Sequence, residues 1–269
     1  MRTYSLAYLT ANASTVPQAI GIAAELGYAY VGLRVQPNGP GAPYQTLIGN
    51  APVLRETQAV MRDTGVGVYD LEIIRIGEHF NVADHAALMD IGQTLGAKAV
   101  LVAADDPNES RLADHYAHLC ETMRPFGLTG DLEFMPWTAV KDAKAAMRII
   151  DLAGRPSNAG LLIDGLHFGR STTSLADIAA IPRELLHYAQ MCDATAGLNF
   201  TNEELIHTAR QERLLPGEGN IDLQGLFATL PQDLPVSVEI VNLERSKPIG
   251  DLAWAKLSLD ASKKVLGDA

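Results

Sequence analysis

Apolar runs of strand length alternate with segments of helical spacing along nearly the whole chain. Eight runs have the length and apolar character of buried strands. They lie at residues 4–9, 29–35, 66–74, 98–103, 127–134, 160–164, 187–193 and 236–241. Segments with apolar positions three and four apart, most of them ended by Gly, predict helices. These lie at 17–26, 51–63, 82–95, 109–124, 139–153, 174–181, 223–229 and 251–265. A long polar stretch, 194–222, receives no element.

Eight strand-then-helix units predict a fold of the α/β class. Alternation of this kind indicates parallel βαβ units. Eight units in about 250 residues match the size of a (β/α)8 TIM barrel, so we expect a single domain over residues 1–269. An open doubly wound sheet is the alternative, but no Gly-rich phosphate motif follows the first strand.

Composition and charge narrow the possible partners. No apolar run approaches the ~20 residues of a membrane span, and no apolar signal region begins the chain, so we expect a cytoplasmic protein without a membrane partner. Cys120 and Cys192 lie in apolar segments, as free buried thiols do. The net charge is −11. Because Lys and Arg are sparse and scattered, nucleic acid is not an expected partner, although Arg75, Arg170 and Arg213 could bind a small anion.

Polar side chains stand near the carboxyl ends of four consecutive predicted strands, where barrel active sites lie. Glu133 ends the fifth strand and Asp164 the sixth, and Gln190 and Glu239 lie in the seventh and eighth. Three converging carboxylates would repel one another without a cation, and oxygen ligands suit Mg²⁺ or Mn²⁺. The alternative is that each carboxylate pairs with an Arg or caps a helix. His167 and Arg170 follow Asp164 at three-residue intervals.

This pattern resembles the xylose-isomerase-like TIM barrels, a superfamily of sugar and sugar-phosphate isomerases and epimerases. The resemblance is strongest in Glu133, in Asp164-Gly-Leu-His167, in Glu239 and in the segment 213–222, where an Arg precedes a Pro-Gly-Xaa-Gly turn and an Asp. It implies that Glu133, Asp164, Gln190 and Glu239 hold one divalent metal. It also implies that Glu133 and Glu239 act as acid and base, that His167 supports the site, that Arg213 binds substrate, and that the protein forms a homodimer or homotetramer.

The residue in the seventh strand departs from the usual family pattern. His is most often the ligand there, whereas this chain has Gln190, whose neutral oxygen favours Mn²⁺ or Mg²⁺, with Co²⁺ possible, over Zn²⁺. We interpret His187, three residues earlier, as structural. The 3-dehydroshikimate dehydratases, a branch of the superfamily, use Gln at this point. This chain resembles them in residues 190–194, in residues 178–182 and in the Pro-Gly-Xaa-Gly turn, and Arg75 could correspond to their carboxylate-binding Arg.

Other residues near the predicted site have two interpretations. Glu72 either faces the substrate or pairs with Arg75 or Arg34. Trp137 and Phe168 either wall the site or pack in the core.

The main functional hypothesis is a metal-dependent isomerase or epimerase acting on a small hydroxy-carbonyl compound. A carboxylate removes the proton α to the carbonyl, and the metal stabilises the enediolate. The second hypothesis is a lyase, in which loss of β-hydroxide follows the same proton removal. An abasic-site nuclease would need a basic face, which the net charge opposes. A binding protein that has lost its chemistry would not need the set of Glu133, Asp164, His167 and Glu239.

Overall fold

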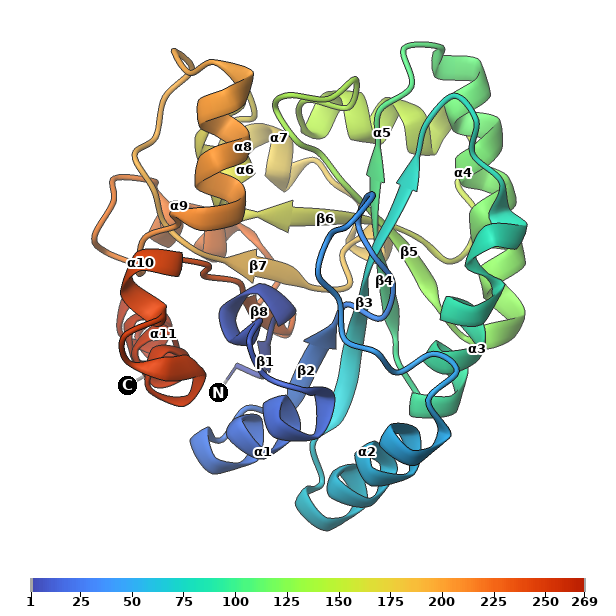
Figure 1. Cartoon of the computed structure of the whole chain (residues 1–269). Helices are drawn as coiled ribbons and strands as arrows, with labels where there is room; N and C mark the ends of the chain where they lie inside the picture. The colour runs from blue at the N-terminus through green and yellow to red at the C-terminus, as the bar shows by residue number, and fades with distance from the viewer. Residues whose placement is uncertain (1, 269) are drawn as a thin grey trace.

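Parallel strands form a closed barrel in the computed structural model, which describes residues 2–268 (Figure 1). Within these residues the barrel has eight strands, each paired with the next in chain order, and β1 pairs with β8 to close it. The strands are β1 Tyr4–Leu6, β2 Tyr30–Leu33, β3 Gly67–Ile76, β4 Ala99–Ala104, β5 Thr129–Glu133, β6 Ala159–Asp164, β7 Ala189–Met191 and β8 Val236–Val238. The predicted (β/α)8 TIM barrel is confirmed.

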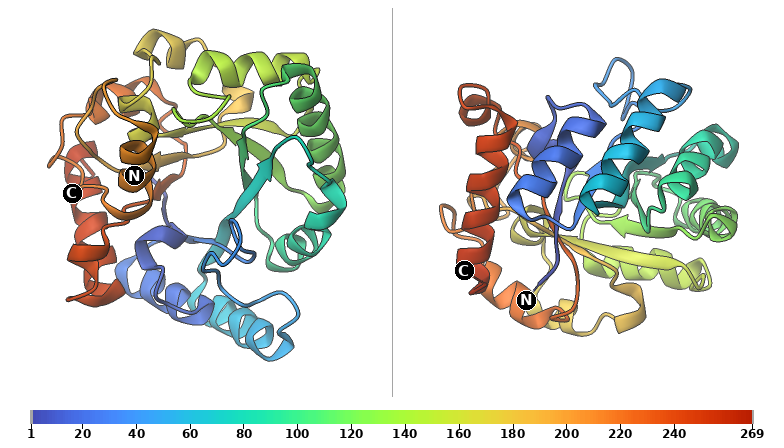
Figure 2. Two further views of the ribbon diagram at one scale, coloured as in Figure 1. Left: turned by 45° about the horizontal axis from the view of Figure 1, so that its top comes forward. Right: turned by 90° about the horizontal axis from the view of Figure 1, so that it is seen from below.

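Helices form a ring around the outside of the strands (Figure 2). The helices of this ring are α1 Val16–Leu26, α2 Ala51–Thr64, α3 Ala86–Leu95, α4 Glu109–Met123, α5 Ala143–Leu152, α7 Leu175–Ala179, α9 Leu223–Thr229 and α11 Gly250–Leu266. Their ends follow local chemistry: the Thr15 hydroxyl and the Gln18 side chain form a capping box at the start of α1, and Gly27 ends α1 in the left-handed conformation.

Three further α-helices lie in segments for which the sequence predicted none. They are α6 Gly165–Gly169, α8 Asn202–Gln211 and α10 Leu243–Ser246. The prediction that 194–222 lacks an element is therefore wrong for α8. This helix begins at a capping box between Thr201 and Glu204, but it buries only Leu205 and Ala209, so it offers few apolar positions from which a helix could be predicted.

Several predicted strands are shorter in the structure. The run 4–9 ends as a strand at Leu6, because residues 8–11 form the 3₁₀-helix η1 (Tyr8–Ala11). The Thr10 hydroxyl of η1 donates to the Val238 carbonyl at 2.8 Å and accepts from the Ile240 N–H at 2.7 Å. The last strand consequently ends at Val238, and Glu239 stands just beyond it.

Side chains pack on both faces of the barrel wall. Outward strand residues such as Leu33 and Leu71 join helix residues such as Ile20 in the core between strands and helices. Inside the barrel, Leu101, Leu162 and Tyr188 form a smaller apolar cluster. Cys120 and Cys192 are free and buried, as predicted. Among the described residues, no helix is long and apolar enough to cross a membrane.

Candidate active site

Three carboxylates meet a histidine at the carboxyl end of the barrel. Glu133 ends β5, Asp164 ends β6, and Glu239 directly follows β8, and all three are almost fully buried. The Asp164 Oδ1 atom caps α6 by accepting the His167 N–H at 3.0 Å, which is why the imidazole lies over the strand ends. The His167 Nε2 atom is 3.5 Å from the Glu133 Oε1 atom and 3.9 Å from the Asp164 Oδ1 atom.

These residues fit a divalent cation. Ligand atoms of Glu133, Asp164 and His167 lie within 4.8 Å of one another. Gln190 is in register with Asp164 on the neighbouring strand, and its buried Oε1 atom has no hydrogen-bonding partner among residues 2–268. A buried oxygen without a donor is costly, and a hard cation would satisfy it. His167, to which the resemblance gives a supporting role, is thus close enough to be a ligand itself.

Arg213 lies between two of the carboxylates. Its Nη1 atom is 2.6 Å from the Asp164 Oδ2 atom, and its Nη2 atom is 2.9 Å from the Glu239 Oε2 atom. The Nη1 atom also donates to the Cys192 Sγ atom at 3.1 Å. Arg213 is only 2 % exposed, so water screens these ion pairs weakly. Most of its N–H donors are bonded to other groups of the protein.

Burial and nearby charges shift the pKa values of the ionisable site residues in different directions. It raises the pKa of Glu239 to about 8, against the effect of Arg213. Burial and the nearby carboxylates of Asp164 and Glu239 raise the pKa of Glu133 well above its usual value. Burial also acts upward on Asp164, but the charge of Arg213 and the hydrogen bonds from Arg213 and the His167 N–H outweigh it, so the pKa of Asp164 is lowered. Burial lowers the pKa of His167 to about 4, so its imidazole is neutral at pH 7.

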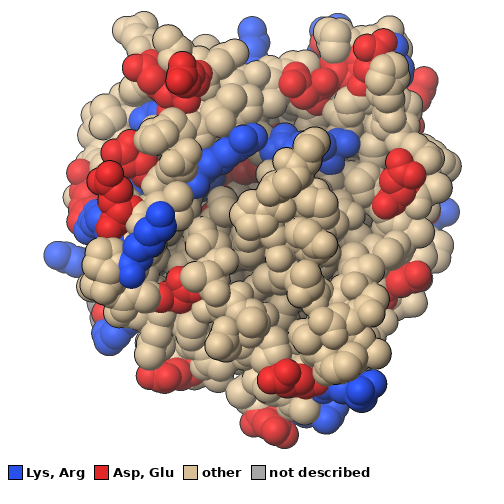
Figure 3. Space-filling view, viewed as in Figure 1, with Lys and Arg blue, Asp and Glu red and all other residues tan. Residues whose placement is uncertain are grey.

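A cavity of about 50 Å³ leads from the surface to these groups. Residues from several elements line it, namely Leu9, Arg34, Asn38, Glu72, Ile73, Arg75, Leu101, Glu133, Met135, Trp137, His167, Ala209, Arg210, Arg213 and Glu239. Figure 3 shows basic side chains along one edge of the hollow at the centre of this face. Burial first, and the like charge of Arg210, which lines the same cavity, second, lower the pKa of Arg75.

The structure brings most of the predicted site residues together. Glu72 lines the cavity and pairs with Arg34 at 2.9 Å, and Arg75 lines it with its guanidinium bonded to Asn38. Trp137 lines it edge-on to the His167 ring, with centroids 5.1 Å apart.

Three residues lie elsewhere. Arg170 is directed away from the cavity, donates to the Thr195 carbonyl and stacks on Phe200 at 3.9 Å. Phe168 packs in the core, and His187 bonds to Asp131 at 2.7 Å, as its structural interpretation predicts.

Sequence reasoning missed the binding potential of Arg210 and Asn38. Arg210 belongs to α8, whose existence was not predicted, and Asn38 lies in a loop after β2 without a motif. Arg34, considered only as a partner of Glu72, directly follows β2 and so stands where barrel sites are built.

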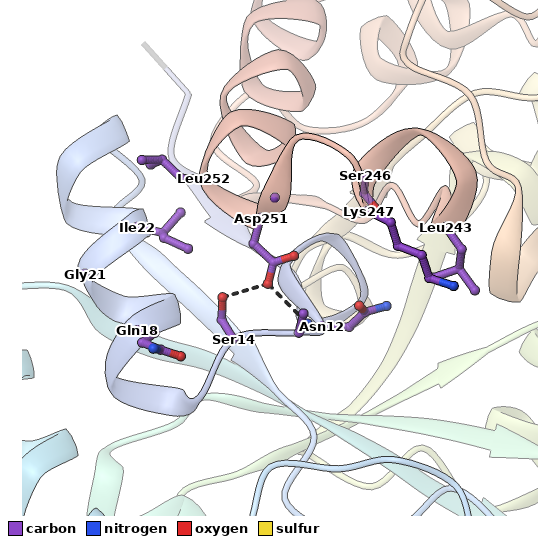
Figure 4. Close-up of a pocket in the computed structure, with 12 residues that line it drawn as sticks. Asn12, Ser14, Gln18, Gly21, Ile22, Leu243, Ser246, Lys247, Asp251 and Leu252 are labelled. Carbon is purple, nitrogen blue, oxygen red and sulfur yellow. Dashed lines mark hydrogen bonds between the residues drawn. The ribbon is translucent and has the colours of Figure 1, made fainter.

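A larger groove of about 560 Å³ lies between α1 and the pair α10–α11 (Figure 4). The carboxylate that faces it is used in the fold, because the Asp251 Oδ2 atom accepts from the Ser14 hydroxyl at 2.6 Å and from the Ala13 N–H at 3.1 Å. The remaining lining includes Ile22, Leu252 and Lys247, without a cluster of reactive groups among the described residues. The small cavity over Glu133 and Glu239 is therefore the candidate active site.

Comparisons with known proteins agree with this architecture. The sequence model of the xylose isomerase-like TIM barrel family matches residues 20–264. A curated 3-dehydroshikimate dehydratase of Pseudomonas aeruginosa is 29 % identical over 177 residues, which are 62 % of this chain and 27 % of that protein. The match thus spans about a quarter of the length of this relative.

Two solved structures have the same fold. The IolI protein, solved with a bound zinc atom, has a TM-score of 0.79 at 17 % identity and covers 99 % of this chain and 98 % of its own. The D-allulose 3-epimerase of a Methylomonas species has a TM-score of 0.67 at 16 % identity and covers 98 % of both chains. At these identities the two structures establish the fold alone.

Proposed function

Because the chain belongs to the xylose isomerase-like TIM barrel family, we propose that it is an enzyme that removes the proton α to a carbonyl with the help of one divalent cation. The observation that carries this proposal is the buried group of Glu133, Asp164 and His167, with the unpartnered oxygen of Gln190 on the residue in register with Asp164. Arg213 pairs with Asp164 and Glu239, but among residues 2–268 Glu133 has only the neutral His167 within ion-pair distance, so an ionised Glu133 is expensive to bury without a cation.

Glu133, Asp164, Gln190 and Glu239 are the residues that would hold the cation. Three carboxylates and an amide oxygen suit Mn²⁺ or Mg²⁺, with Co²⁺ possible. When bound, the cation would supply Lewis acidity to the substrate carbonyl. Neutral His167, near Glu133 and Asp164, either joins the ligands or orients them.

The mouth of the cavity favours an anionic substrate. Arg75 and Arg210 both line it, and among residues 2–268 only Arg75 of the two has a side-chain partner, the amide of Asn38. Guanidinium groups bind carboxylates and phosphates through a planar fork of donors. A carboxylate-bearing hydroxy ketone such as 3-dehydroshikimate fits this combination, and the curated relative at 29 % identity acts on that class by name.

Glu133 and Glu239 are the residues that would transfer protons to and from the substrate. One carboxylate accepts the proton α to the carbonyl, and the C–H electron pair forms a double bond as the β-carbon–oxygen bond breaks. The departing hydroxide takes a proton and leaves as water. The second candidate is an epimerase, which returns the proton to the other face of the carbon. It is favoured by the placement of Glu133 at the end of β5 and Glu239 just after β8, two strands that are not neighbours, with both residues lining the cavity.

Parallel assays on 3-dehydroshikimate and on a ketose distinguish these reactions. We expect dehydration of 3-dehydroshikimate to a dihydroxybenzoate when Mn²⁺ or Mg²⁺ is present, and no dehydration after EDTA treatment. The ultraviolet absorbance of the product measures the rate. Glu133→Gln and Glu239→Gln should each lower the rate by about 10²-fold or more, since each removes an acid–base group. Glu244→Gln, at an exposed position of α10, is the matched control. Ketose turnover alone would support the epimerase, and full activity of both glutamine variants would exclude both mechanisms.

A further inference from the structure

The guanidinium of Arg213 is bonded to other residues of the protein, without any bound substrate. Its guanidinium spans from Asp164 on β6 to Glu239 after β8, taking one oxygen of each carboxylate. The Nη1 atom also donates to the Glu239 backbone carbonyl at 3.2 Å, and the Nε atom donates to the Ala209 carbonyl at 3.1 Å. Both terminal nitrogens of the guanidinium are therefore bonded to residues at the strand ends, and the Nε atom is bonded to α8.

The backbone around Arg213 is held just as firmly. The Arg213 N–H donates to the Val241 carbonyl at 2.7 Å, and the Asn242 amide donates back to the Arg213 carbonyl at 3.1 Å. Glu212 forms an isolated bridge with Asn242. The backbone of Arg213 is thus fixed to the segment after β8, so the side chain reaches the carboxylates from a fixed starting point.

We propose that Arg213 is a positioning residue that orients Asp164 and Glu239 for the cation, which deepens the proposed function and rests on it. Arg213 occupies Oδ2 of Asp164 and Oε2 of Glu239. The other Asp164 oxygen, Oδ1, is the one near the His167 ring, and that ring approaches Glu133. This clamp of two carboxylates by Arg213 leaves Oδ1 of Asp164 with the ligand atoms of Glu133 and His167. It also leaves Oε1 of Glu239, a residue that lines the cavity, without a bond to Arg213.

The forked shape of the guanidinium is essential to this role. Two carboxylates from different strands are held by two nitrogens of one planar group, an arrangement that a single ammonium nitrogen cannot reproduce. Loss of a partner that orients a metal ligand typically lowers metal affinity ~10–100-fold. Arg213→Lys keeps the positive charge and removes the fork, so it separates orientation from electrostatic effects.

The decisive measurement is Mn²⁺ affinity by isothermal titration calorimetry, without substrate. We expect the Kd of Arg213→Lys to rise about tenfold or more over that of the wild type. The matched control is Arg170→Lys, another buried Arg that contacts the Thr195 carbonyl and the Thr208 hydroxyl but no site carboxylate. Its Kd should stay close to the wild-type value. An unchanged Kd in Arg213→Lys with a lower kcat/KM would overturn the inference and make Arg213 a substrate-binding residue.

A second variant covers the case in which Arg213→Lys does not fold. In Arg213→Ala, low-millimolar guanidinium should tighten Mn²⁺ binding, with no such effect in the wild type. By its charge alone, a guanidinium ion bound in the cavity would repel Mn²⁺. A lower Kd for Mn²⁺ in its presence would therefore report that guanidinium orients the carboxylates. Absence of rescue in a folded Arg213→Ala protein would contradict the clamp. A wild-type protein that binds no divalent cation would instead overturn the proposed function itself.

Discussion

Asp70 is a single residue whose ionisation the barrel interior opposes. It is 2 % exposed, its Oδ1 atom has no partner among residues 2–268, and both carboxylate oxygens lie 2.9 Å from where a Cβ on Gly32 would stand. Burial, and then the charges of Glu72 and Glu239, raise the pKa of Asp70 well above its ordinary value. Asp70 therefore keeps its proton to a higher pH than an exposed Asp does.

This raised pKa predicts how stability depends on pH. Above pH ~4 the unfolded chain releases the Asp70 proton while the folded chain keeps it, so this contribution to stability is lost as pH rises through the folded pKa. Asp70→Asn should flatten that decline, so the free energy of unfolding of the variant should fall less between pH 5 and pH 8 than that of the wild type. Urea unfolding at pH 5 and pH 8 measures it, with Asp63→Asn on the exposed face of α2 as the control. Parallel pH profiles for wild type and Asp70→Asn would mean that Asp70 is ionised in the fold.

At the scale of elements, the turn after Arg213 ties the segment 194–222, of which it is a part, to Asp193. The Asp193 carboxylate accepts backbone N–H groups from Ala194 at 2.8 Å, Gly217 at 2.9 Å and Gly219 at 3.0 Å. A Cβ on Gly219 would come within 2.3 Å of both the Ala194 carbonyl oxygen and the Asp193 Oδ1 atom. The Pro-Gly-Xaa-Gly turn therefore needs glycine for close approach of the backbone.

We expect Gly219→Ala to loosen this segment while the barrel stays folded. The turn must move away from Asp193, and Arg213 lies only a few residues before it. Limited proteolysis should cut within 195–222 faster than in the wild type, and kcat/KM should fall about tenfold or more, as for a lost support of metal ligands. Gly39→Ala, where a Cβ meets open space, is the control. A normal cleavage rate would show that the turn tolerates the methyl group.

At the scale of the whole molecule, the proposed cation should stabilise the fold. A ligand that binds only the folded state at about 100 times its Kd contributes ~2.7 kcal/mol, which for a chain of this size raises Tm by roughly 5–10 °C. The shift should be larger at pH 8 than at pH 6, because Glu239, with a pKa of about 8, must lose its proton to bind a cation.

Thermal scans with EDTA and with Mn²⁺ measure this shift. Gln190→Ala should reduce it by removing the unpartnered oxygen, whereas Gln224→Ala, at an exposed position of α9, should not. Equal Tm values with and without Mn²⁺ in the wild type would contradict the cation site.

The sequence alone determined the architecture and the strand ends that carry chemistry. Eight apolar runs at regular intervals specify parallel strands, because buried strands need apolar side chains on both faces. Polar residues inside such runs are costly, so Glu133, Asp164, Gln190 and Glu239 are conspicuous without a structure. The bond from the His167 N–H to Asp164 was not predicted, because the sequence indicated no helix directly after the sixth strand for Asp164 to cap.

Only the tertiary structure decided which of these residues meet and how. Arg213 comes from a polar segment whose helix, α8, offers few apolar positions, and its contacts with Asp164 and Glu239 cross 49 and 26 positions. Arg34 rather than Arg75 pairs with Glu72, and Arg170 supports the 195–208 region instead of the cavity. Long charged side chains reach partners far away in the sequence, so their pairing depends on packing around the closed barrel, which local periodicity does not encode.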